Sequence, residues 1–116
     1  METIKKPWGC EEIIEQNSRY MLKRLTMLKG HRCSIQYHNF KHETIYVLSG
    51  QLNIYLGDTI QQLTSSTYGP NESLAIPAKL VHRMEALEDT VYLEASTPEL
   101  DDVIRLKDDY QRDLDL

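Results

Sequence analysis

Short segments in which apolar and polar residues alternate recur along this chain, and turn-forming residues separate them. In residues 51–56 the alternation puts Leu52, Ile54 and Leu56 on one face of a strand, and Gly57-Asp58 follows as a hairpin turn. Strand signals of this kind, with turn signals about every 8–12 residues, predict an all-β sandwich or barrel. The predicted strands are 20–28, 34–38, 44–48, 51–56, 59–63, 73–76, 82–86 and 90–95.

The length of the chain, 116 residues, suits one domain over residues 1–116. Within it we expect residues 1–18 to form an N-terminal arm and residues 101–116 to form an acidic C-terminal tail. Apolar residues lie near the start of the tail and polar residues follow. The tail could therefore form either a helix or a strand that is followed by a loose end.

The charge pattern excludes some classes of partner. A formal net charge of -5 without any basic run is unlike the concentrated positive face that nucleic-acid binding needs. No segment approaches the roughly 20 apolar residues that cross a membrane, and the N-terminus has no signal-peptide core. Cys10 and Cys33 form no CxxC pair, so we expect two unbridged thiols in a reducing compartment. These features predict a cytoplasmic protein that binds neither nucleic acid nor a membrane.

Four residues in or next to the predicted strands are candidate metal ligands: Gln36, His38, Glu43 and His82. Gln36 and His38 are two residues apart, so both side chains point to the same face. Glu43 opens the next strand, and His82 follows the strand end at Pro77. If the chain closes into a barrel, two imidazole nitrogens, a carboxylate oxygen and an amide oxygen converge. This donor set suits one divalent metal ion, with zinc expected first and manganese, iron, cobalt or nickel as alternatives.

The same residues carry a resemblance to a known family. The order and spacing of Gly30, Gln36, His38, Glu43 and Gly50 resemble the first cupin motif, with glutamine where many cupins have histidine. The second motif keeps Pro77 and His82 at the expected separation, and Lys79 stands where glycine is usual.

The resemblance can be narrowed to one cupin family. Pro7-Trp8-Gly9, residues 19–25 and residues 101–112 are similar to the C-terminal cupin domain of type II mannose-6-phosphate isomerases, which are often fused to a mannose-1-phosphate guanylyltransferase. We expect a stand-alone version of that domain. In this family glutamine is usual at the position of Gln36. The resemblance implies the cupin double-stranded β-helix, a jelly-roll barrel.

The resemblance also implies aldose–ketose isomerisation of a phosphorylated sugar of the mannose 6-phosphate/fructose 6-phosphate type. Such a reaction needs a general base, for which His42, Glu85 and Glu94 are candidates. Phosphate binding needs cations, and arginine is favoured for its bidentate grip. We expect Arg83, His42 and Glu85 as catalytic residues. The expected substrate-binding residues are Lys23, Arg24, Lys41 and Arg83.

Residues 39–45 differ most from the family, where a run of histidines and an arginine is usual, so two other functions stay open. One is a cupin that binds a sugar or a sugar nucleotide without catalysis. The other is a different metal-dependent cupin enzyme, such as a dioxygenase, which needs two adjacent open metal positions. By analogy with small cupins that pair through strand edges, we expect a homodimer.

Overall fold

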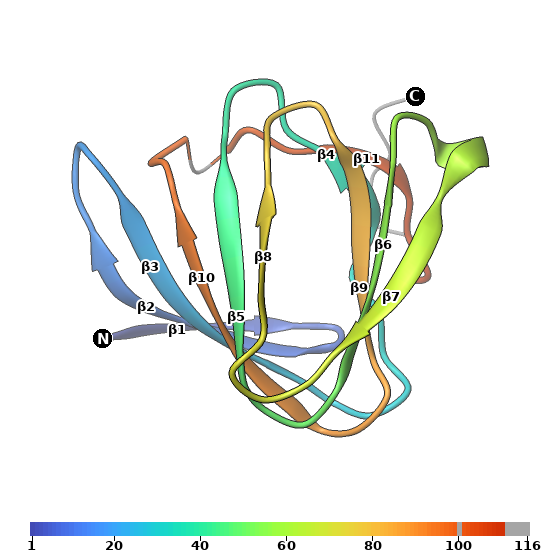
Figure 1. Cartoon of the computed structure of the whole chain (residues 1–116). Coiled ribbons are helices and arrows are strands. Elements are labelled where there is room, and N and C mark those ends of the chain that lie inside the picture. The colour runs from blue at the N-terminus through green and yellow to red at the C-terminus, as the bar shows by residue number, and fades with distance from the viewer. Residues whose placement is uncertain (100, 111–116) are drawn as a thin grey trace.

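The computed structural model describes residues 1–99 and 101–110, and its regular structure there consists of eleven strands and one short 3-10 turn (Figure 1). The strands form two antiparallel sheets with the orders β1-β2-β3-β10-β5-β8 and β11-β4-β9-β6-β7. The strands are β1 (Glu2–Lys6), β2 (Gly9–Gln16), β3 (Met21–Met27), β4 (Ile35–Tyr37), β5 (Glu43–Ser49), β6 (Leu52–Gly57), β7 (Thr64–Tyr68), β8 (Ser73–Ile76), β9 (Val81–Ala86), β10 (Thr90–Ser96) and β11 (Ile104–Lys107).

From β4 onward the chain crosses repeatedly between the two sheets, which is the pattern of a jelly-roll barrel. The two sheets converge at the bottom of Figure 1 and diverge at the top, where the β4–β5 and β8–β9 connections lie. The all-β barrel predicted from the sequence is confirmed. Within the described residues, no helix has the length and apolar character needed to cross a membrane.

The core lies between the sheets and follows the alternation of the strands. In β3 and β5 every second side chain is buried, and in β6 the predicted inward residues Leu52 and Ile54 are buried. Trp8 and Tyr92 add the largest ring systems to the same cluster. Cys10 and Cys33 form no disulfide, as the sequence analysis predicted.

One predicted strand is wrong. Residues 59–63 were expected to return as a strand, but Ile60–Gln62 form a short 3-10 turn, and the return strand is β7. Residues 64–67, Thr-Ser-Ser-Thr, show no apolar alternation because this edge strand is exposed on both faces. Its pairing with β6 therefore fixes β7 as a strand, with Leu52 opposite Tyr68.

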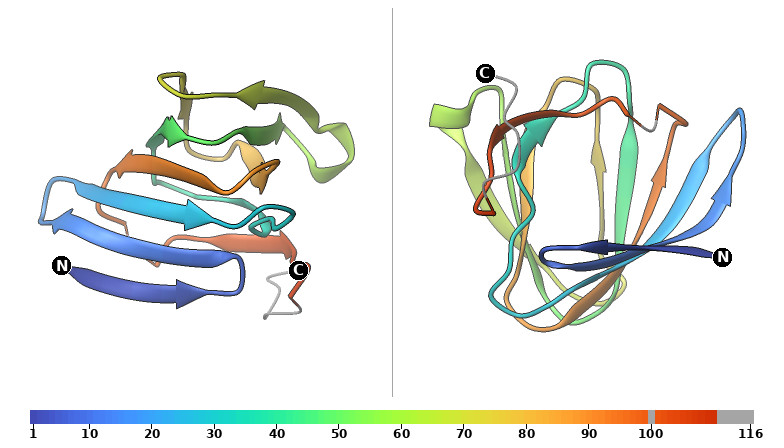
Figure 2. Two further views of the ribbon diagram at one scale, coloured as in Figure 1. Left: turned by 90° about the horizontal axis from the view of Figure 1, so that it is seen from below. Right: turned by 180° about the vertical axis from the view of Figure 1, so that it is seen from behind.

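The two ends of the chain also belong to the sheets. Residues 1–18, expected as an arm, contribute β1 and β2, which extend the six-stranded sheet beyond β3 (Figure 2). The tail takes the strand alternative, because β11 pairs with β4. The rest of the tail, residues 111–116, lies outside the described residues.

Gly50 and Gly30 offer a matched test of the turns between strands. Both have positive φ angles, 88° and 83°, but a Cβ at Gly50 would lie 2.7 Å from the Thr90 Cα, whereas one at Gly30 would meet nothing within 4 Å. We expect Gly30→Ala to cost about 1 kcal/mol of unfolding free energy, from backbone strain alone. Gly50→Ala should cost roughly 3 kcal/mol or more, since it adds a backbone clash. Urea unfolding measures both losses, and equal losses would contradict the steric argument.

Candidate metal centre

Three buried side chains from separate segments meet between the two sheets. His38 follows β4, Glu43 begins β5, and His82 lies in β9. Nε2 of His82 is 3.0 Å from Oε1 of Glu43, and Nε2 of His38 is 3.5 Å from the same oxygen. One ligand atom from each residue lies within 4.8 Å of the others. The cluster therefore joins the five-stranded sheet to the six-stranded sheet, near the end where they diverge.

The second nitrogen of each imidazole is held by a backbone carbonyl. Nδ1 of His82 lies 2.9 Å from the carbonyl oxygen of Leu80, and Nδ1 of His38 lies 2.5 Å from that of Asp102. A carbonyl accepts but does not donate, so each Nδ1 carries the proton. Each Nε2 then presents its lone pair to Glu43, as in histidines that bind metal.

The three facing atoms lack a donor. His38 Nε2, His82 Nε2 and Glu43 Oε1 are fully buried, and none has a hydrogen-bond partner among the described residues. Buried polar atoms are nearly always satisfied, so three acceptors aimed at one another need an explanation. A cation held between them would satisfy all three, and the mixed nitrogen and oxygen donors suit a divalent transition metal. The cluster thus fits a metal ion.

The carboxyl group of Glu43 is ionised despite its burial. Burial raises the pKa of Glu43, but hydrogen bonds that His38 and His82 donate when they are protonated, together with the charge of Lys41, hold this pKa well below its ordinary value. An ionised carboxylate is the form that binds a metal.

Gln36 lies where the sequence expects the fourth ligand. It is the register partner of His82 across β4 and β9, and it lines the same cleft as His38 and Glu43. Its amide oxygen accepts a hydrogen bond from Ser34 Oγ at 3.1 Å. Metal binding by Gln36 stays a prediction.

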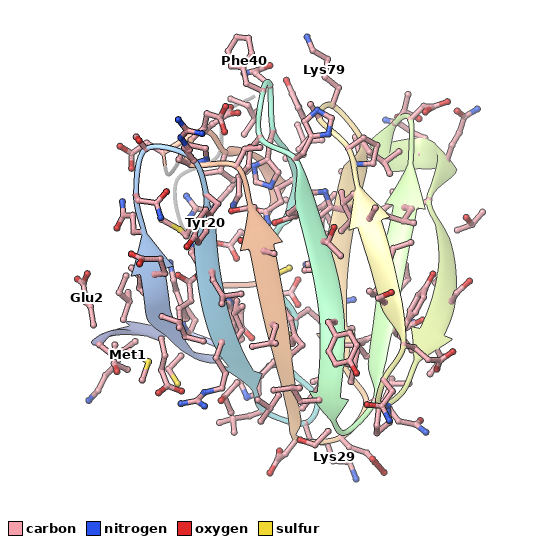
Figure 3. The ribbon with its side chains drawn as sticks, turned by 60° about the vertical axis from the view of Figure 1, so that its left-hand side comes forward. Met1, Glu2, Tyr20, Lys29, Phe40 and Lys79 are labelled. Carbon is pink, nitrogen blue, oxygen red and sulfur yellow. The ribbon has the colours of Figure 1, made fainter. Side chains whose placement is uncertain are left out.

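Two loops close this end of the barrel, and their tips, Phe40 and Lys79, are labelled in Figure 3. The amide of Lys79 donates to the carbonyl of His38 at 2.6 Å, which ties the β8–β9 loop to the first ligand segment. Lys79 has a φ of 73°. This left-handed backbone explains why glycine is usual at this position of the motif.

The cluster opens into a polar cleft of about 420 Å³. The cleft is lined by four basic and four acidic side chains, and its other lining residues are Ile4, Val103, Gln36 and His38. The basic residues are Lys6, Lys23, Lys41 and Arg105, and the acidic residues are Glu11, Glu43, Glu94 and Asp101.

Lys41 and Glu94 form a buried pair beside the cluster. Lys41 Nζ lies 3.1 Å from Glu94 Oε2 and 3.7 Å from Glu43 Oε2. Burial raises the pKa of Glu94, and the neighbouring charge of Glu43 raises it further, against the opposing effect of Lys41. Burial lowers the pKa of Lys41, but the two carboxylates outweigh it and the net pKa is raised. Lys41 therefore stays charged between two carboxyl groups.

The expected catalytic residues lie outside this cleft. Arg83 donates from Nε to the carbonyl of Cys33 at 3.0 Å and from Nη2 to Asp109 at 3.1 Å. Glu85 accepts a hydrogen bond from Tyr55 at 2.8 Å, also on the side of β9 that faces away from His82. His42 lines a second groove, which reaches the outer side of the six-stranded sheet and which Glu43 also lines. Their catalytic roles stay predictions, and Arg83 and Glu85 point away from the metal cluster.

Two of the expected phosphate-binding residues, Lys23 and Arg24, lie on opposite faces of β3. Lys23 points into the cleft, where Nζ lies 3.3 Å from Glu11 Oε2, whereas Arg24 points outward and pairs with Glu12 at 2.9 Å. Of the four expected cations, Lys23 and Lys41 line the cleft.

Several residues that line the cleft carried no distinctive sequence signal. Lys6 and Glu11 come from β1 and β2, for which no strands were predicted, and Arg105 comes from β11, whose strand was only one of two alternatives. Alternation of side chains in the first 16 residues is the sequence signal that could have predicted the strands of Lys6 and Glu11. Glu94 was a candidate base in the sequence, and it is the one of the three candidates that lines the cleft.

Comparisons with known proteins agree on the fold and the family. A family model described as mannose-6-phosphate isomerase C-terminal matches residues 1–108. The chain is 32% identical over 114 residues to a mannose-1-phosphate guanylyltransferase of Escherichia coli K12 and 31% identical to the xanthan biosynthesis protein XanB of Xanthomonas campestris, covering 94% of this chain in both cases. It spans only 23% of the length of each relative.

Solved structures give the same fold at low identity. KdgF from Halomonas sp. superposes with a TM-score of 0.76 at 17% identity, over 87% of this chain and 89% of that one. An RmlC-like cupin from Shewanella frigidimarina gives 0.75 at 14% identity, over 86% of both chains. The chain therefore has the cupin fold and belongs to the family of mannose-6-phosphate isomerase C-terminal domains.

Proposed function

We propose that this domain catalyses the metal-dependent interconversion of a phosphorylated aldose and its ketose, of the mannose 6-phosphate/fructose 6-phosphate type. The observation that carries the proposal is the set of three unsatisfied acceptors on His38, Glu43 and His82. Two of these residues, His38 and Glu43, line a cleft that Glu94 and Lys41 also line. The family description supports the choice of substrate.

A divalent ion, zinc by first expectation, would be held by His38, Glu43 and His82 with Gln36 as fourth ligand, and it would supply Lewis-acid polarisation of the sugar's carbonyl oxygen. The three protein side chains that carry the cluster are already fixed by their neighbours. They would therefore need little reorganisation when the ion binds.

The charge of the cleft supports a phosphorylated substrate. Its four basic and four acidic side chains balance, so a divalent ion would leave two positive charges in excess. A phosphate monoester carries a charge of about -1.5 to -2 at pH 7 and would restore the balance. Lys6 and Lys23 share Glu11 as partner, at 3.8 and 3.3 Å, whereas Lys41 pairs with Glu94 beside the cluster. We assign the phosphate to Lys6 and Lys23.

Glu94 is our candidate for proton transfer. Isomerisation moves a proton between C2 and C1 of the sugar, while the hydroxyl proton passes between O2 and O1. Glu94 is the carboxyl group next to the cluster that is not itself an expected ligand, and Lys41 holds it at 3.1 Å. In this role it accepts the proton from C2 and returns it to C1.

The metal site can be tested with three histidine variants. We expect the metal-free protein to take up about one equivalent of zinc or manganese, and His38→Ala and His82→Ala to weaken binding at least roughly 100-fold, since each removes a ligand. His42→Ala is the matched control, because His42 is close in sequence but does not belong to the cluster or line the cleft. Calorimetric titration with each ion measures the affinities. Wild-type affinity in both ligand variants would overturn the metal site.

The isomerase activity can be tested on the metal-loaded protein with mannose 6-phosphate. We expect fructose 6-phosphate as product, and a loss of about 10²–10⁴ in kcat for Glu94→Gln with metal binding retained. A similar loss in Glu85→Gln, with Glu94→Gln active, would instead support the base outside the cleft. If the wild type binds the sugar phosphate by calorimetry but gives no product with any of the candidate metals, the domain is a binding module and the isomerase proposal fails.

We also propose that two copies pair through the outer face of the six-stranded sheet. Tyr46 and Leu48 are 37% and 42% exposed on this face. Among the outward positions of β3, β10, β5 and β8, the one charged residue is Arg24, and Glu12 neutralises its charge. For a chain with a net charge of -5, this neutral face brings two copies together without like-charge repulsion. The other outward residues are Leu22, Thr26, Thr44, Ser73, Ala75, Val91, Leu93 and Ala95.

Sedimentation velocity tests the pairing. We expect a dimer for the wild type and a monomer for Leu48→Lys, because a lysine at the centre of an apolar interface loses its hydration. Leu87→Lys is the matched control, since Leu87 is similarly exposed, at 40%, in the β9–β10 connection. A monomeric wild type, or a dimer that survives Leu48→Lys, would rule out this interface.

A further inference from the structure

Asp102, in the C-terminal segment, is bound to three successive amides of the loop between β4 and β5. Its Oδ1 accepts from the amide of Asn39 at 2.9 Å, and its Oδ2 accepts from those of Phe40 at 2.7 Å and Lys41 at 2.9 Å. A carboxylate that accepts several backbone hydrogen bonds fixes the shape of the loop that donates them.

The same residue holds the first histidine of the cluster. The carbonyl oxygen of Asp102 accepts the hydrogen bond from His38 Nδ1. This contact sets both the tautomer and the orientation of the ring whose Nε2 faces Glu43. The sequence motif assigns no role to the acidic tail, and the four hydrogen bonds of Asp102 come from residues more than 60 positions away in the chain.

The loop held by Asp102 leads directly from one expected ligand to the next. It begins at His38, includes Lys41, and ends at Glu43, where β5 starts. Its far end is tied separately, because the amide of His42 donates to Thr97 Oγ1 at 3.0 Å. Without the Asp102 carboxylate, the loop from Asn39 to Lys41 would lose three hydrogen bonds, and the backbone carbonyl that orients His38 would no longer be anchored to that loop.

We propose that Asp102 is a positioning residue of the metal centre, and that metal binding and docking of the C-terminal segment stabilise each other through it. The inference rests on the proposed metal site, since it assigns a role toward that ion. Coupling of this kind is reciprocal: the segment raises the affinity for the ion, and the ion strengthens the hold on the segment.

Asp109 provides a matched control for this inference. It also fastens the C-terminal segment by its carboxylate, to Arg32 at 2.8 Å and Arg83 at 3.1 Å, but neither partner belongs to the 39–41 loop. Loss of either aspartate should loosen the segment. Loss of Asp102 alone should disturb the metal cluster.

The test compares zinc affinities of the wild type, Asp102→Ala, Asp102→Asn and Asp109→Ala, by competition with a chromophoric chelator on protein that circular dichroism shows to be folded. We expect Asp102→Ala to lose about 10–100-fold in affinity, the usual effect of removing a residue that orients a ligand. Both variants keep the backbone carbonyl that His38 contacts, but Asp102→Asn also keeps one side-chain acceptor for the loop amides, so its loss should be smaller. Asp109→Ala should stay near the wild type.

Hydrogen exchange supplies a second readout that a general loss of stability would not produce. In the wild type, zinc should slow exchange at the amides of Asn39, Phe40 and Lys41 but not at that of Gln62, which bonds to Thr59 in the distant 3-10 turn. If Asp102→Ala does not fold, this measurement and Asp102→Asn still decide the question.

The outcomes separate the two proposals. Wild-type zinc affinity in both Asp102 variants, or equal losses in Asp102→Ala and Asp109→Ala, would overturn the positioning role while the metal site stands. Absence of zinc binding in the wild type would overturn the metal site, and the role of Asp102 with it.

Discussion

The site depends on the way two twisted sheets face each other, because each inward side chain of one sheet can then meet inward side chains of the other. The same strands that build the apolar core at the converging end supply polar groups at the diverging end. One strand thus serves both purposes through a single alternation of side chains. The inward positions run Glu43, Ile45, Val47 along β5 and His82, Met84, Ala86 along β9.

Charge pairing makes the polar end of the barrel tolerable. Glu43, Glu94 and Lys41 are almost completely enclosed, and each would be costly to bury alone. Lys41 contacts both carboxylates, which leaves the histidine nitrogens and one oxygen of Glu43 unsatisfied. Apolar residues of similar size often stabilise a protein at least as well as such a network does. Because this charged network lies beside three unsatisfied acceptors, a role in metal binding and catalysis explains it better than a contribution to stability.

The sequence could predict the cluster but not the base. His38, Glu43 and His82 follow from spacing, since strand alternation fixes which neighbours share a face. Alternation from His82 already puts Glu85 on the opposite face of its strand. Choosing Glu94 requires knowing which face of β10 points inward, and its apolar residues Val91, Leu93 and Ala95 suggest the wrong face. For β9, His82 points inward, so Arg83 and Glu85 both point outward. The return strand was misplaced because β7 has no apolar face to mark it.

By itself, the sequence determined the class of fold, most of the strands and three groups that fit a metal ion, because these depend on local periodicity and motif spacing. Only the tertiary structure decided which charges share the cleft and what holds the ligands in place. Asp102 illustrates the difference: its hydrogen bonds reach residues more than 60 positions away. Such contacts arise when β11 pairs with β4, and no local pattern records that pairing.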